Sequence, residues 1–141
     1  MTHESFTIKK LQQNAIIPTR GSEGAAGYDL YTIESGIIPP LSLATIHTGL
    51  FITIPAPFYA GMFGRSGLAV KHGLEVKGDN IYGSGEIILK IYNNRSVSYQ
   101  YNQGERIAQM VFVYAEGTPI EVVDELDDTK RGECGFGSTG K

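Results

Sequence analysis

Residues 43–55 read LATIHTGLFITIP, and this stretch gives the clearest sign of how the chain folds. Apolar and polar side chains alternate along it, and its β-branched residues favour an extended strand. The same alternating pattern occurs in four other stretches, namely SFTIKKL (5–11), GEIILKIYNN (85–94), SVSYQYN (96–102) and RIAQMVFVYAE (106–116). The chain is therefore predicted to consist mainly of strands.

Turn-forming residues separate these stretches about every ten residues, as expected for many short strands. They occur in IIPPLS (37–42), PAPF (55–58), YNNRS (92–96), NQGE (102–105) and EGTP (116–119). No segment keeps a helical period, and the best helix candidate is SGLAVKHG (66–73), one or two turns that end at Gly73. We therefore predict an all-β fold, a barrel of the jelly-roll type.

Length and charge limit the classes of function. The chain has 141 residues, the size of one domain, and its net charge of −3 argues against nucleic acid or an anionic membrane as a partner. No apolar run approaches the roughly 20 residues of a membrane span, and the N-terminal MTHESFTIKK lacks the apolar core of a signal peptide. We expect an intracellular protein, cytoplasmic or nuclear.

The end of the chain differs in composition from the rest. Residues 131–141, RGECGFGSTGK, contain four glycines and one large apolar side chain. Such a segment does not pack as a strand, so we predict a barrel domain over residues 1–130 and a flexible, glycine-rich segment over 131–141. Cys134 is the single cysteine, which excludes an internal disulfide and a cysteine-rich zinc site.

Two stretches offer groups that suit a phosphate ligand. In GAAGYDLYT (24–32), small residues permit close approach beside Asp29, although an exposed Asp at the start of a strand would explain the same pattern. In FGRSGLAVKHG (63–73), a guanidinium, a hydroxyl and unhindered N–H groups come from Arg65, Ser66 and Gly67. The alternative is that Ser66 caps the helix and Arg65 is solvated.

Two further stretches carry polar groups in unusual settings. In GERIAQM (104–110), alternation places Gln109 on one face with Ile107 and Val111, opposite Arg106, so its amide needs a partner. That partner is a neighbouring strand or loop, a water or a ligand. In GFGSTG (135–140), an aromatic ring and two hydroxyls on a glycine frame suit a segment that closes over a nucleotide, although a frayed terminus is the simpler interpretation.

These stretches together resemble one family. AGYDLYT, GRSGLA, GERIAQM and RGECGFGSTG are similar, in order and spacing, to the first, second, fourth and fifth motifs of the trimeric dUTP pyrophosphatases, or dUTPases. The resemblance implies a jelly-roll-like barrel of the β-clip type and a homotrimer whose active sites are shared between subunits. It also implies hydrolysis of dUTP to dUMP and pyrophosphate, which limits uracil in DNA and supplies dUMP for thymidylate synthesis.

The resemblance assigns roles to individual residues. Arg65, Ser66 and Gly67 would bind the phosphates, and Gln109 would also help to order the attacking water. Asp29 would support Mg²⁺ through water only, because the family holds this ion by the three phosphates and by waters. In the C-terminal segment, Phe136 would stack on uracil. The residues that would close on the γ-phosphate are Arg131, Gly137, Ser138 and Thr139.

The stretch KGDNIYGSGE (77–86) departs from the family's third motif, G-V-I-D-x-D-Y-R-G-E. Counted forward from GRSG (64–67), the loop is about two residues shorter than is usual in the family. An alignment fixed instead on Gly85-Glu86 puts Asn80 at the catalytic Asp and Tyr82 at the second Asp. The spacing Asp-x-x-Tyr survives as Asp79 and Tyr82, which would then be the base that activates water and the group that rejects a 2′-hydroxyl. Alternatively, Asp79 misses the water, and the chain is a catalytically impaired, nucleotide-binding or regulatory homologue.

The dCTP deaminases are the alternative enzyme class. The dCTP deaminases resemble dUTPases in fold and have a similar Arg-Ser segment, but they carry a catalytic Glu in the strand that corresponds to EIILKIYNN. Here that position is Lys90, and Glu86 lies four residues earlier. Lysine cannot replace the carboxylate, so the sequence favours a dUTPase.

Overall fold

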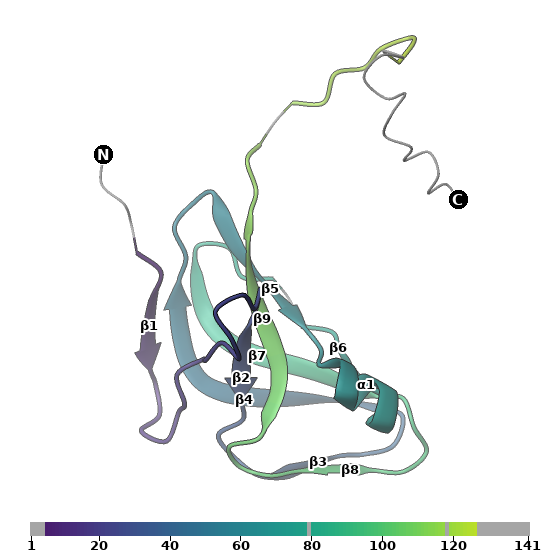
Figure 1. Ribbon diagram of the computed structural model, residues 1–141. Coiled ribbons are helices and arrows are strands. Elements are labelled where there is room, and N and C mark those ends of the chain that lie inside the picture. Colours follow the sequence, from purple (N-terminus) through teal and green to yellow (C-terminus); the bar gives the residue numbers. More distant parts are fainter. Residues whose placement is uncertain (1–4, 79, 118, 127–141) are drawn as a thin grey trace.

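The computed structural model describes residues 5–78, 80–117 and 119–126, and within these ranges the chain is almost entirely strand, with one short helix (Figure 1). The strands form three antiparallel groups that wrap around a shared core of Ile, Leu and Met side chains. The predicted all-β fold is confirmed. In this described part of the chain, no helix has the length and apolar character that crossing a membrane requires.

The largest sheet has the order β1-β4-β7-β6. Its strands are β1 (Thr7–Lys10), β4 (Ser42–Thr53), β7 (Ser84–Asn93) and β6 (Leu74–Val76). Strict alternation along β7 sends Ile87, Leu89 and Ile91 into the core, where each is fully buried, and leaves Glu86 and Lys90 outside. This sheet supplies much of the apolar burial that stabilises the fold.

The other two sheets close the barrel. One has the order β2-β9-β5, formed by β2 (Tyr28–Tyr31), β9 (Arg106–Tyr114) and β5 (Phe58–Phe63), and the other pairs β3 (Gly36–Ile38) with β8 (Tyr99–Tyr101). Central β9 is flanked on both sides, so its polar side chains sit between two other strands. The described residues after β9 extend away from the strands (Figure 1).

Helix α1 (Ser66–His72) lies where the sequence predicts a helix, and it ends at Gly73 in the left-handed conformation, with φ 66°. The alternative in which Ser66 caps the helix is wrong, because Arg65 occupies the N-cap and no side chain caps the first turn. None of its residues is fully buried. Leu68 is partly buried and packs against the core, and Arg95 Nη2 donates to the Val70 carbonyl at 2.9 Å.

Candidate active site

Pairing of β2 with β9 brings the first and third of the predicted stretches side by side. Asp29 is the register partner of Gln109, and Phe63 of β5 is the partner of Gln109 on the other side. A Cβ atom at Gly27 would lie 2.9 Å from Gln109 Oε1. The small residue at 27 therefore leaves room for the Gln109 amide at the centre of this sheet.

A β-bulge in β9 changes the predicted faces. Leu30 pairs with Ala108 but the next residue, Tyr31, pairs with Arg106, so Ile107 is an extra residue on β9. Ile107 and Ala108 are consequently both buried. The prediction that Arg106 lies opposite Gln109 is therefore wrong: the bulge turns Arg106 to the side of Asp29 and Gln109.

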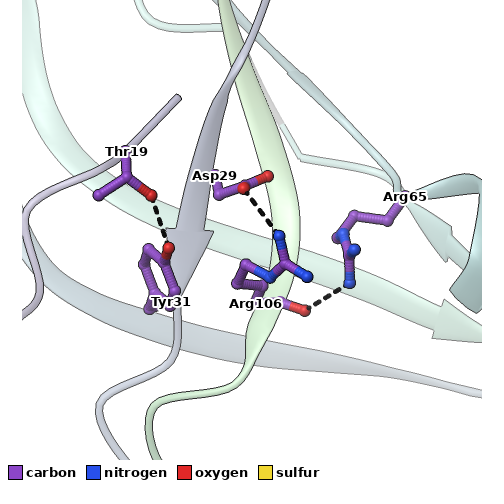
Figure 2. A network of polar contacts seen from close by, with 5 residues as sticks. All are labelled: Thr19, Asp29, Tyr31, Arg65 and Arg106. Carbon is purple, nitrogen blue, oxygen red and sulfur yellow. Dashed lines mark hydrogen bonds and ion pairs between the residues drawn. The ribbon is translucent and has the colours of Figure 1, made fainter. Parts of the chain in front are cut away.

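A polar network forms on this side of the sheet (Figure 2). Arg106 Nη1 lies 3.2 Å from Asp29 Oδ2, and the Asp29 side chain is only 13 % exposed. From the loop before α1, Arg65 Nη1 donates to the Arg106 carbonyl at 3.4 Å. The Arg106 guanidinium thus pairs with the Asp29 carboxylate, and the Arg65 guanidinium reaches the same part of β9. Forked N–H donors of this kind suit a polyanionic ligand.

The turn that leads into β9 is braced by Glu105. Its Oε1 atom accepts from the Asn102 N–H at 3.0 Å, and the Tyr99 hydroxyl donates to its Oε2 atom. Burial raises the pKa of Tyr99, the bond to Glu105 raises it further, and the Arg65 guanidinium opposes the rise.

Ser66 and Gly67 follow Arg65 on the exposed first turn of α1. A Cβ atom at Gly67 would meet nothing within 4 Å, so the chain itself does not fill the space beside this residue. This open surface next to two guanidinium groups has room for a phosphate chain.

The donor set limits how a metal ion could be held here. Among the described residues, no three His, Cys, Asp or Glu side chains form a cluster that could hold a metal ion. Asp29 offers one carboxylate, and its Oδ2 already faces Arg106. Mg²⁺ commonly binds through one or two carboxylates, several waters and substrate phosphates. The residues therefore fit a hydrated ion held chiefly by phosphates, and not an ion held by the protein alone.

The shortened stretch forms an edge addition to the β5 sheet. Ile81 exchanges two backbone hydrogen bonds with Ala60, 3.0 and 2.9 Å, and the Gly83 carbonyl accepts from the Ile54 N–H at 2.6 Å. The Tyr82 ring is 67 % exposed and stacks on Tyr59, with centroids 5.0 Å apart. Beside it lies a hollow of about 450 Å³, bounded by Asn80, Ile81, Tyr82 and the outer side of β7 as far as Lys90.

Several predicted site residues lie outside the described part of the chain. They are Asp79, Arg131, Phe136, Gly137, Ser138 and Thr139. Their assignments stay predictions. Those that the structure describes fall into two groups. The first group lies around the β2-β9 pair and consists of Asp29, Arg65 and Gln109. Ser66 and Gly67 come directly after Arg65 in the chain. Tyr82 alone forms the second group and borders the hollow on the other side of β5.

A comparison with protein families shows to which family the chain belongs. The dUTPase family model matches residues 13–140. The chain belongs to the dUTPase family. It is 46 % identical to the deoxyuridine 5'-triphosphate nucleotidohydrolase of Antonospora locustae over 140 residues, 97 % of each chain. It is 41 % identical to that of Encephalitozoon cuniculi over 142 residues, 99 % of each chain.

Solved structures of dUTPases share the architecture. The Staphylococcus bacteriophage 80alpha dUTPase with dUPNHPP superposes with a TM-score of 0.79 and 27 % identity, covering 99 % of this chain and 100 % of that one. The family resemblance drawn from four motifs is thus confirmed, together with the jelly-roll-like fold.

Sequence reasoning missed Arg106 as a site residue, although it lies inside the motif GERIAQM. A signal was present: strict alternation would have put this guanidinium on the face of Ala108 and Met110, which are both buried. A charged residue predicted on a buried face indicates a break in the alternation.

Proposed function

We propose that this chain hydrolyses dUTP to dUMP and pyrophosphate, and that it does so as a homotrimer. The observation that carries the proposal is the convergence of Asp29, Arg106 and Arg65 from three separate segments (Figure 2). Gln109 is the register partner of Asp29 in the same sheet. Matching names among relatives that are 46 % and 41 % identical support the same activity.

The triphosphate binds on the β2-β9 side. Arg65 offers a planar fork of donors, Ser66 a hydroxyl, and Gly67 the clearance for the phosphate chain. The Arg106 ion pair holds the Asp29 carboxylate near this surface, where it orients water. When Mg²⁺ is bound by the phosphates, it supplies further neutralisation of their charge. The protein's contribution is then position and charge complementarity at the phosphorus that is attacked.

The nucleoside binds in the hollow beside Tyr82. The backbone of residues 80–83 reads the uracil edge, and the Tyr82 ring packs on the deoxyribose, where a 2′-hydroxyl would clash. Asp79 accepts the proton of the attacking water, with Gln109 ordering that water. The products require cleavage of the α–β phosphoanhydride bond. The segment 131–141 then closes on the ligand, with Phe136 over the base and Arg131, Ser138 and Thr139 at the γ-phosphate.

Assembly completes the site. Among the described residues of one chain, no hydrogen bond or ion pair joins Arg65, Arg106 or Asp29 to the Tyr82 stretch beside the hollow. Ile120 and Val122 are 91 % and 92 % exposed on the segment that leaves the barrel. Both observations support an assembly in which a second subunit covers apolar side chains and contributes to each site.

Product analysis tests the proposal against its rivals. Full-length protein is incubated with Mg²⁺ and either dUTP or dCTP, and nucleotides, pyrophosphate and ammonia are quantified. We expect equal amounts of dUMP and pyrophosphate from dUTP, and no ammonia from dCTP, since Lys90 is exposed and no carboxylate replaces it. Ammonia from dCTP would establish a deaminase. Tight binding of a non-hydrolysable dUTP analogue without turnover of dUTP would establish the impaired homologue.

A further inference from the structure

The Tyr82 ring forms the wall between two hollows. The first is the hollow of about 450 Å³ along β7 described above, and the second, of about 290 Å³, is bounded by Ile54, Pro57, Phe58 and Tyr59. Tyr82 borders both, whereas Tyr59 borders only the second. Tyr59 therefore supports Tyr82 from the side that faces away from the first hollow.

Other contacts restrain the Tyr82 ring weakly. The Tyr82 ring lies nearly parallel to the Tyr59 ring, with an interplanar angle of 29°. The hydrogen bond from Asn80 Nδ2 to the Tyr82 hydroxyl is long, 3.5 Å. The next residue, Gly83, has no side chain and a φ of 78°. Backbone bonds at Ile81 and Gly83 fix the chain on either side of Tyr82 but do not choose the direction of its ring.

Tyr59 is a firm support because of its place in the fold. It lies on β5, in register with Val113 of β9, and its neighbour Ala60 is fully buried and bonded to Ile81 on the other edge. A side chain on a strand that is paired on both edges is held more closely than one on a turn. The stretch around Tyr82 contains glycine at 78, 83 and 85, so it supplies few side chains of its own for this purpose.

We infer that Tyr59 is a positioning residue for substrate selectivity: its ring sets the orientation of Tyr82, and through it the rejection of ribonucleotides. The inference rests on the proposed function, in which Tyr82 packs on the sugar. Tyr59 itself touches no substrate. A variant that lacks the Tyr59 ring should therefore still fold, but its ratio of activity on dUTP to activity on UTP should change.

The test compares kcat/KM for dUTP with kcat/KM for UTP in full-length protein. Tyr59→Leu removes the flat ring, and we expect the dUTP/UTP ratio to fall by about tenfold. Tyr59→Phe keeps the ring, and its ratio should stay within about twofold of the parent's. The matched control is Tyr114→Leu, which removes a 58 % exposed ring packed edge-on against Phe58 and should leave the ratio unchanged. Tyr59→Val, which retains strand propensity, replaces Tyr59→Leu if the latter unfolds.

A second variant, Tyr82→Leu, distinguishes the role proposed for Tyr82 from the role proposed for Tyr59. If Tyr82→Leu lowers the ratio but Tyr59→Leu and Tyr59→Val leave it within about twofold, the positioning role of Tyr59 is wrong and the proposed function stands. If Tyr82→Leu leaves the ratio unchanged, the sugar-selecting role proposed for Tyr82 is wrong, and the positioning role of Tyr59 is wrong as well. Equal losses on dUTP and UTP in Tyr59→Leu would show that the stack only stabilises the edge of the sheet.

Discussion

The charged cluster around Asp29 and the short stretch around Tyr82 are held in different ways. Asp29 and Gln109 are register partners inside a three-stranded sheet, and a bulge adds Arg106 to them. The Tyr82 stretch lies at an edge, joined to β5 by two backbone hydrogen bonds at Ile81 and supported by one aromatic stack. The first region also matches the family's motifs, whereas the second departs from the family's third motif.

The difference shows where this fold tolerates change. Altering the length of a central strand would shift the register of every side chain beyond it, including Gln109. An edge stretch that ends in glycine can lose residues while its flanking hydrogen bonds to β5 and β4 are kept. The phosphate side is therefore constrained by the sheet, and the sugar side depends on local contacts that can be replaced.

The largest effect is expected at Asp79, the base assigned to the shortened stretch. Asp79→Asn should lower the rate of the chemical step by about 10³-fold, because an amide cannot accept the proton of the attacking water. Binding of a non-hydrolysable dUTP analogue should be nearly unchanged. Single-turnover kinetics and analogue titration measure the two quantities. Unaltered turnover would show that the shortened stretch does not supply the base.

Removal of residues 131–141 should have the next largest effect. The truncated chain should lose on the order of 100-fold in kcat/KM for dUTP, since the proposed closure over the base and the γ-phosphate is lost. Its assembly, measured by light scattering, should remain that of the full-length protein, because the described strands do not include the segment. Full activity after truncation would exclude a role in closure for the segment.

Arg106 tests the phosphate side directly. Arg106→Met leaves the 13 % exposed Asp29 side chain without its ion-pair partner, and we expect a loss of about 1–2 kcal/mol in the free energy of unfolding. The kcat/KM for dUTP should fall by about tenfold, because Asp29 loses the group that positions it. Urea unfolding and steady-state kinetics provide the two measurements.

An exposed ion pair of similar length is the control. Lys77 Nζ lies 3.1 Å from Glu75 Oε1, but the two side chains are 54 % and 43 % exposed. Lys77→Met should change the free energy of unfolding by at most about 0.5 kcal/mol. Adding Asp29→Asn to Arg106→Met should recover part of the lost stability, since no stranded carboxylate remains. Strictly additive losses would mean that the two side chains do not act as a pair.

The smallest effect concerns Tyr99 and appears only in alkali. Burial, followed by its bond to Glu105, raises the pKa of Tyr99 in the folded protein. Its contribution to stability is therefore complete below the unfolded pKa of about 10 and is lost as the pH rises above that value. Unfolding free energies measured from about two pH units below to about one unit above the unfolded pKa should decline less steeply in Tyr99→Phe. Identical slopes would argue against this brace at the entrance to β9.

The sequence predicted strands best where one face meets the core and the other meets solvent. The alternation in β4 and β7 and the helix end at Gly73 were all readable in advance. In contrast, β5 was missed, because three consecutive residues of it, Ala60 to Met62, are buried and no alternation results. Three-residue strands such as β3 and β6 are too short to show a period, and β3 lay partly in a stretch interpreted as a turn.

The candidate site divides along similar lines. Asp29, Arg65 and Gln109 were found from the sequence. Small residues beside Asp29, donors at the start of a helical turn for Arg65 and an amide in an apolar strand for Gln109 drew attention to them, and the family resemblance assigned their roles. Arg106 was misplaced because strict alternation was assumed along β9, whereas a one-residue bulge turns its side chain to the other face. Tyr59 gave no signal at all, since its importance arises from a contact with a residue that lies 23 positions later in the chain.

The central claim is that the shortened stretch still forms a working, selective site. The most direct test is pyrophosphate release from dUTP, with dCTP, dTTP and UTP alongside, using micromolar protein and Mg²⁺ and a sample shown to be folded and assembled. We expect rapid turnover confined to dUTP. Absence of turnover, or equal rates on dUTP and UTP, would contradict the claim.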